Sequence, residues 1–249
     1  MKNFTKLIVK YLIEITIIII GVIIAFYLTQ YGEQINRSQN ERDVMNQIYF
    51  ELEDNLEDLE RDFLIHRTGF ISHLNVMNFL DGKKAYSDTL ILDFYWMTRD
   101  EYIFANATGY ENLKTFGINL IKDDTLRNLI TLVYNHDFPR LTKGSTLHPD
   151  LNAYLSPFFQ EHFSVNKDTS IQYTLAFSDS LQITYPRDIA LGVKQVIGYV
   201  PRDVEALKQN EEFRYLVTNA LEFRMYKFSF YQSCISNVKE AMQRIKGVY

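Results

Sequence analysis

Two histidines and one arginine are the residues of this chain best placed for chemistry. His66 and His73 lie in one apolar, helix-like stretch, and Arg224 lies in a second. Their spacing separates the two imidazole rings by about 10 Å along a helix, too far for one metal ion to bind both directly. The histidines are therefore either polar positions that interrupt an apolar helix seam or a pH-responsive joint. Arg224, if buried, needs a carboxylate or carbonyl partner.

The sequence contains no familiar catalytic motif around these residues. It has no Gly-x-Ser-x-Gly, no Gly-x-Gly-x-x-Gly, no Walker loop and no His-Glu-x-x-His. The single cysteine, Cys234, excludes an intrachain disulfide and a cysteine-based zinc site, and we expect a buried, unreactive thiol rather than half of an intermolecular disulfide. We expect no catalytic, cofactor-binding or metal-binding residue, no cofactor and no enzymatic activity.

One apolar stretch, Leu7 to Tyr31, dominates the start of the chain. Between Tyr11 and Leu28 its only strongly polar side chains are Glu14 and Thr16. That length suffices to cross a bilayer as a helix, which takes roughly 20 residues. The stretch is longer than the apolar region of a signal peptide, and no Ala-x-Ala cleavage site follows it. We therefore predict an uncleaved transmembrane anchor, with a short cytoplasmic tip, in residues 1–34.

The distribution of charged residues predicts on which side of the membrane each end of the anchor lies. Lys2, Lys6 and Lys10 precede the apolar stretch, whereas acidic and basic residues are nearly balanced after it. The positive-inside rule then puts the N-terminus in the cytoplasm and residues 35–249 outside, in the periplasm of a Gram-negative cell with the anchor in its inner membrane. The whole chain has 31 acidic and 26 basic residues and no basic stripe, so we expect no nucleic-acid partner.

A stripe of residues on the anchor suggests helix association. Gly21 and Ala25 form a small-xxx-small pair, which lets two helix backbones approach closely. Glu14 lies on the same stripe and either takes part in self-association or, being near the membrane boundary, extends to water or pairs with Lys10. At helical spacing the stripe comprises Glu14, Ile18, Gly21, Ala25 and Leu28.

Two long helices are predicted near the ends of the remaining chain, at 43–80 and from Asp203 or Glu211 to Lys246. In both, apolar residues alternate at spacings of four and three, the coiled-coil pattern of helices packed side by side, and we expect them to be antiparallel. Leu56, Leu59, Phe63, Phe228, Ile235 and Val238 should be buried. The acidic run from Glu51 to Asp62 is interpreted as a solvated face rather than a calcium site, which needs a turn and a glycine.

Shorter elements are predicted between these helices. Alternation around Ser178–Ser180 predicts a β-hairpin over 171–185, and the segment 186–201 is read as a short helix and a loop. Helices are expected at 87–104 with Ser87 as N-cap, at 108–117 with Thr108 as N-cap, at 125–135 closed by Pro139, and at 149–163. The predicted fold is mainly α: a transmembrane helix followed by an extracytoplasmic helical bundle with long antiparallel helices and a small β-hairpin.

Three stretches resemble a family of uncharacterised single-span membrane proteins of Gram-negative bacteria, a domain of unknown function. They are YLIEITIIIIGVIIAFYLTQYGE (11–33), YENLKTFGINLIKDDTLRNLITLVYN (110–135) and EEFRYLVTNALEFR (211–224). The anchor ends in Thr-Gln-Tyr-Gly-Glu, where relatives tend to carry Asn-Asn-Trp-Asn-Glu. The resemblance implies an N-terminal anchor and a helical extracytoplasmic domain, but it implies no activity and no catalytic residues.

These observations favour a membrane-anchored helical interaction or scaffold protein of the cell envelope. Its partners would be the membrane and either a second copy or another membrane protein. One alternative is a small-molecule sensing domain that signals through a partner, since helical bundles can hold ligands between helices. Another is an envelope enzyme of unknown class. A pocket with converging polar groups would favour sensing or catalysis, and a filled bundle would favour scaffolding.

Overall fold

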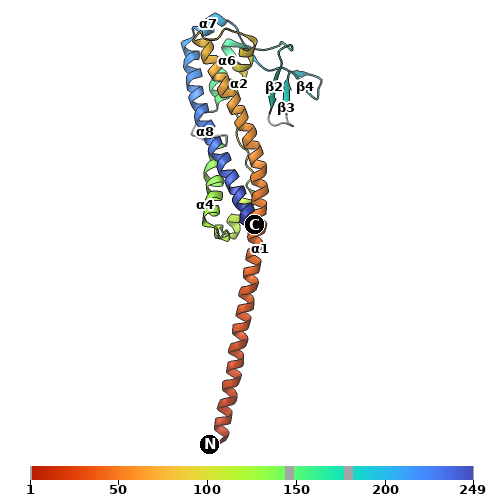
Figure 1. The fold of residues 1–249 in the computed structure, drawn as a ribbon, viewed down its shortest axis with the longest axis vertical. Coiled ribbons are helices and arrows are strands. Elements are labelled where there is room, and N and C mark those ends of the chain that lie inside the picture. Colours follow the sequence, from red (N-terminus) through yellow and green to blue (C-terminus); the bar gives the residue numbers. More distant parts are fainter. Residues whose placement is uncertain (1, 144–148, 177–181, 249) are drawn as a thin grey trace.

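A single helix, α1 (Lys2–Leu80), runs through the predicted anchor and the first predicted long helix without a break. The computed structural model describes residues 2–143, 149–176 and 182–248. With 79 residues, α1 is about 120 Å long at 1.5 Å per residue. Most of its N-terminal half extends away from the rest of the chain, and its C-terminal half forms one side of a bundle (Figure 1). Asp81 and Gly82 end the helix as expected, with Gly82 at φ +73°.

The second long helix, α8 (Glu211–Val248), lies antiparallel along the C-terminal half of α1 (Figure 1). This confirms the predicted pairing. Leu59 and Val238 are fully buried, while four other seam residues are only partly buried: Leu56, Phe63, Phe228 and Ile235. Two packed helices cover a narrow stripe of each other, so the flanks of each seam depend on shorter elements for cover.

Shorter helices complete the bundle around α1 and α8 (Figure 1). They are α2 (Asp88–Thr98), α3 (Thr108–Phe116), η1 (Ile118–Leu120), α4 (Asp124–Leu132), η2 (Val133–Asp137), α5 (Phe138–Leu141), α6 (Leu151–His162) and α7 (Val204–Lys208). One apolar cluster, which includes Leu59, Leu126 and Val238, fills the half of the bundle that contains α3 and α4. A second, which includes Phe94 and Phe213, fills the opposite half with α2 and α6.

Several predicted boundaries are wrong. The second helix ends at Thr98 rather than at Phe104, because the backbone that follows bonds to side chains of α1 and α8. Thr108 is the first residue of α3 rather than its cap, and Asn106 accepts its hydroxyl proton. Pro139 does not end the fourth helix: it lies in the first turn of α5, where its missing N–H costs nothing.

The strands form small antiparallel pairs. β2 (Tyr173–Ala176) pairs with β3 (Gln182–Tyr185), which confirms a hairpin, and its predicted turn at 178–180 lies outside the described residues. The segment 186–201 contains no helix; it holds β4 (Arg187–Asp188), β5 (Lys194–Gln195) and β6 (Tyr199–Pro201). β4 pairs with β5, and β6 pairs with β1 (Phe163–Val165). Gly192 and Gly198, both at positive φ, provide bends that a helix does not allow.

The acidic run on α1 is only partly a solvated face. Glu53, Asp54, Glu57 and Glu60 are exposed, but the residues at its two ends, Glu51 and Asp62, are buried. Glu51 accepts the backbone N–H of Gly109 at 2.7 Å, which fixes the start of α3 against α1. Asp62 lies against the segment that follows α2, within hydrogen-bond distance of Tyr231 on α8.

Candidate functional site

The two apolar clusters are separated by a layer of buried polar side chains. On α1 this layer comprises Asp62, His66 and His73, and on α8 it comprises Arg224 and Lys227. The third component is the non-helical segment 99–107, which connects α2 to α3. Buried polar groups are costly unless they are hydrogen-bonded, so the contacts among these residues decide whether the bundle is stable.

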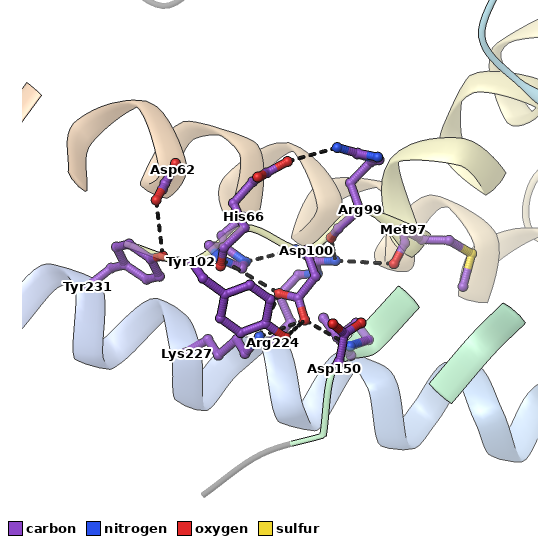
Figure 2. Close-up of polar contacts among 12 residues, drawn as sticks. Asp62, His66, Met97, Arg99, Asp100, Tyr102, Asp150, Arg224, Lys227 and Tyr231 are labelled. Atoms are coloured by element: carbon purple, nitrogen blue, oxygen red, sulfur yellow. Dashed lines mark hydrogen bonds and ion pairs between the residues drawn. The ribbon is translucent and has the colours of Figure 1, made fainter. Parts of the chain in front are cut away.

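Arg224 is the centre of this layer (Figure 2). Its fully buried guanidinium donates through Nη2 to the carbonyl oxygens of Met97 at 3.1 Å and Arg99 at 2.6 Å. Nη1 donates to Nδ1 of His66 at 3.0 Å. Arg224 therefore has the carbonyl partners that its burial requires. Burial lowers the pKa of Arg224 to about 10, so the side chain is charged at neutral pH.

The contacts of His66 define its tautomer. A guanidinium only donates hydrogen bonds, so Nδ1 of His66 must be an acceptor. The proton is then on Nε2, which donates to the carbonyl oxygen of Glu101 at 3.2 Å. Burial, followed by the charges of Arg224 and Lys227, holds the pKa of His66 well below its ordinary value. His66 is therefore a neutral bridge between α8 and the segment 99–107.

His73 is neutral for related reasons. Its Nδ1 lies 2.7 Å from the carbonyl oxygen of Gly69, one turn earlier on α1, and donates to it. Burial and then the charge of Arg224 lower the pKa of His73 to about 3. Within the described residues, no group of three or more His, Cys, Asp or Glu side chains is arranged to hold a metal ion. The pH-responsive joint at His66 and His73 stays a prediction.

A buried ion pair extends the layer toward α6. Nζ of Lys227 lies 2.6 Å from both carboxylate oxygens of Asp100, whose side chain is 1% exposed. Asp100 also accepts the Tyr102 hydroxyl and the backbone N–H of Leu151, both at 2.8 Å. Nζ of Lys227 also lies 4.2 Å from the centre of the Tyr102 ring (Figure 2). Asp100 thus joins α8, α6 and the segment 99–107 through one carboxylate.

Asp62 lies at the edge of the layer, beside a pocket of about 250 Å³ between α1 and the segment 99–107. The Tyr231 hydroxyl lies 3.4 Å from Oδ2 of Asp62 and 3.2 Å from the carbonyl oxygen of Glu101. Burial and the nearby Glu101 charge raise the pKa of Asp62 to about 7. The pKa of the Asp62 carboxyl therefore lies near neutrality.

No family model, curated protein or solved structure matches this chain. Roles for its residues therefore come from geometry alone. The layer holds carbonyl–guanidinium and carboxylate–ammonium contacts, while Nε of Arg224 and Nε2 of His73 have no hydrogen-bond partner among the described residues. These contacts suit structural cross-linking of helices better than acid–base chemistry. Cys234 is buried in the apolar cluster beside α4, and burial raises the pKa of its thiol, as expected for an unreactive cysteine.

The structure brings together only some of the residues singled out in the sequence. His66, His73 and Arg224 meet in the buried layer, whereas Glu14, Ile18, Gly21 and Ala25 lie far away on the free half of α1 (Figure 1). Sequence reasoning missed Asp62, Asp100 and Lys227. The available signal was position: Asp62 is one turn before His66, and Lys227 is three residues after Arg224.

The apolar part of α1 is exposed in the described chain, and the first contact of α1 with the bundle is made beyond it, by Arg37, which donates to the carbonyl oxygen of Asn119 at 3.1 Å. The most apolar window of the helix is 0% buried, and a side chain added at Gly21 would meet nothing within 4 Å. Glu14 forms an ion pair with Lys10 at 3.9 Å, four residues earlier on the helix. The contact fits the alternative in which Glu14 pairs locally, and association through Gly21 and Ala25 stays a prediction.

Proposed function

We propose that this chain is a single-pass protein of the bacterial inner membrane whose helical domain, residues 35–249, binds partners in the cell envelope. The N-terminus lies in the cytoplasm and the domain in the periplasm. The protein acts as a scaffold or interaction module and performs no catalysis of its own. The membrane and a second helix are its first partners.

One observation carries this proposal: α1 is apolar and exposed over residues 15–28, and its C-terminal half is buried in a bundle. Ile18 is 65% exposed and Tyr27 is 71% exposed, whereas Leu52 and Leu59 on the same helix are fully buried. A row of exposed isoleucines is unfavourable in water and favourable in a bilayer. A lipid environment, with or without a partner helix, gives residues 15–28 the burial they lack.

Because α1 is continuous, it can hold the helical domain at a fixed distance and orientation from the predicted membrane span. No proline interrupts the helix, so the bundle is joined to the predicted membrane span by a rigid rod rather than by a flexible linker. The exposed helix between Gly32 and Glu41 sets a fixed spacing of about 14 Å between the two. A scaffold benefits from such a fixed distance and orientation.

A sensing function is the second candidate, and the pocket at Asp62 is the observation that favours it. This pocket lies on α1 itself. A ligand that moved Asp62 would act on the helix that leads to the predicted span. The signal would then pass to a partner through helix association in the membrane.

Two experiments test the proposal. An alkaline phosphatase fusion after Tyr249 should be active and a fluorescent fusion at the same point dark, because the C-terminus is placed in the periplasm. The reverse pattern would refute the orientation. Affinity purification from gentle detergent should then recover envelope proteins that depend on residues 1–34, with the anchor replaced by an unrelated membrane span as the matched control.

A further inference from the structure

We propose that the pocket beside Asp62 binds a small organic ammonium ion, with the nitrogen on the Asp62 carboxylate and the apolar body against Ile65 and Phe104. This inference goes beyond the scaffold function and does not depend on the membrane anchor. It rests on the shape of the pocket, on the hydrogen bonding of Asp62 and on the pairing of the charges around it.

The pocket has an apolar side and a charged side. Ile65 and the aromatic residues Tyr102 and Phe104 supply the first, and Asp62, Glu101 and the ion pair of Asp58 with Arg61 supply the second. Phe104 is 86% exposed, an unusual position for a large aromatic side chain in a segment whose neighbour Ile103 is buried. A volume of about 250 Å³ lies below the range of about 300–1,000 Å³ for drug-sized ligands, so the body must be small.

Asp62 is poorly satisfied by its protein neighbours. Its hydrogen bond comes from the Tyr231 hydroxyl at 3.4 Å, and that single proton has a nearer acceptor, the Glu101 carbonyl oxygen at 3.2 Å. The other carboxylate oxygen of Asp62 points away from Tyr231 (Figure 2). Asp62 is 6% exposed, so an ionised carboxylate here lacks both bulk water and a strong donor.

The nearby cations are already paired with other carboxylates. Arg61 contacts Asp58 at 2.5 Å, and Arg99 contacts Glu101 at 2.9 Å. Within the described part of the chain, Asp62 has no such ion pair. A ligand ammonium group provides the missing charge and donors, and aromatic rings favour a cation beside them. A divalent metal ion fits less well, because no group of three ligating side chains is found among the described residues.

The protonation behaviour of Asp62 agrees with this inference. Its pKa of about 7 reflects burial first and then Glu101, with Asp58 adding to the shift and with Arg61 and the Tyr231 hydrogen bond opposing it. An ammonium ligand binds the ionised form, so its affinity should rise from pH 5.5 to pH 8 as Asp62 loses its proton. Binding near pH 7 should release part of a proton, which calorimetry in two buffers of different ionisation enthalpy detects.

The test is calorimetric titration of the full chain in lipid nanodiscs, with empty nanodiscs as the blank. The probes are benzylammonium, benzyl alcohol as its neutral counterpart and benzoate. Benzylammonium should bind and the other two should not. Asp62→Asn, which keeps the shape and an acceptor for Tyr231, should weaken binding about tenfold or more. Glu57→Gln, which removes an exposed carboxylate of α1 that does not line the pocket, should change affinity less than about threefold.

Phe104→Ala provides a second variant, because an exposed side chain can be shortened without loss of folding. It should weaken benzylammonium binding and leave the pH dependence in place, whereas Asp62→Asn should abolish that dependence. Failure of benzylammonium to bind, equal binding of benzyl alcohol, or unchanged affinity in both variants would overturn the proposal.

Discussion

The guanidinium of Arg224 lies directly on Gly69 of α1. A Cβ atom at position 69 would lie 2.6 Å from Cζ of Arg224, closer than any such contact in a relaxed structure. The absence of a side chain at Gly69 thus gives Arg224 its path from α8 to the carbonyls of Met97 and Arg99. The layer that joins the two halves of the bundle depends on this contact.

Gly69→Ala should destabilise the bundle by about 1–3 kcal/mol, the usual cost of overpacking a filled interior. Gly247→Ala in the last turn of α8, with nothing within 4 Å, is the control and should change stability by less than about 0.5 kcal/mol. Urea unfolding of the full chain in detergent, followed by fluorescence of the single tryptophan Trp96, measures both. In an Arg224→Ala background the cost of Gly69→Ala should disappear; an unchanged cost would place the clash elsewhere.

Leu59→Ala should cost about 2–5 kcal/mol, because it deletes a fully buried side chain from the apolar cluster between α1 and α8. The matched change on the exposed face of the same turn, Glu57→Ala, should cost less than about 0.5 kcal/mol. The same unfolding measurement compares the two variants. Similar costs for both would mean that α1 and α8 do not pack through this seam.

His73 should make the bundle less stable in acid. Its folded pKa of about 3 lies below the ordinary value of 6.5, so the unfolded chain binds more protons between these values. The stability contributed by neutral His73 is complete above pH 6.5 and is lost as the pH falls toward 3. His73→Asn keeps an N–H for the Gly69 carbonyl and should flatten this slope in urea titrations at several pH values. An equally steep slope in the variant would refute the assignment.

Gly21→Ile should weaken self-association of the anchor by about 1 kcal/mol or more, because the larger side chain separates two backbones that otherwise approach closely. A membrane two-hybrid reporter carrying residues 1–34 measures the change. Val22→Ile, which adds bulk off the stripe, is the control. If Gly21→Ile associates as well as the unaltered anchor, any self-association belongs to the helical domain.

Local pattern was enough to predict the long elements. The apolar run at the start of α1 is recognised by its length, the seams of α1 and α8 repeat at helical spacing, and the β2–β3 hairpin alternates with a period of two. Such periodicities are properties of residues close together in the sequence, so they can be recognised without knowledge of the fold. The need of a buried Arg224 for a carbonyl partner follows in the same way, because it depends only on the chemistry of a guanidinium.

Tertiary contacts determined where the second helix ends and which residues of the acidic run are buried. Residues 99–104 carry a pattern compatible with a helix, yet they are not helical because their carbonyls bond to Arg224, His66 and Tyr231 from other helices. Glu51 and Asp62 look like members of a solvated acidic face, and they are buried because the segment 99–107 and α3 cover that side of α1. Whether a polar residue is buried depends on which distant part of the chain packs against it. The spacing of residues in the local sequence carries no information about that contact.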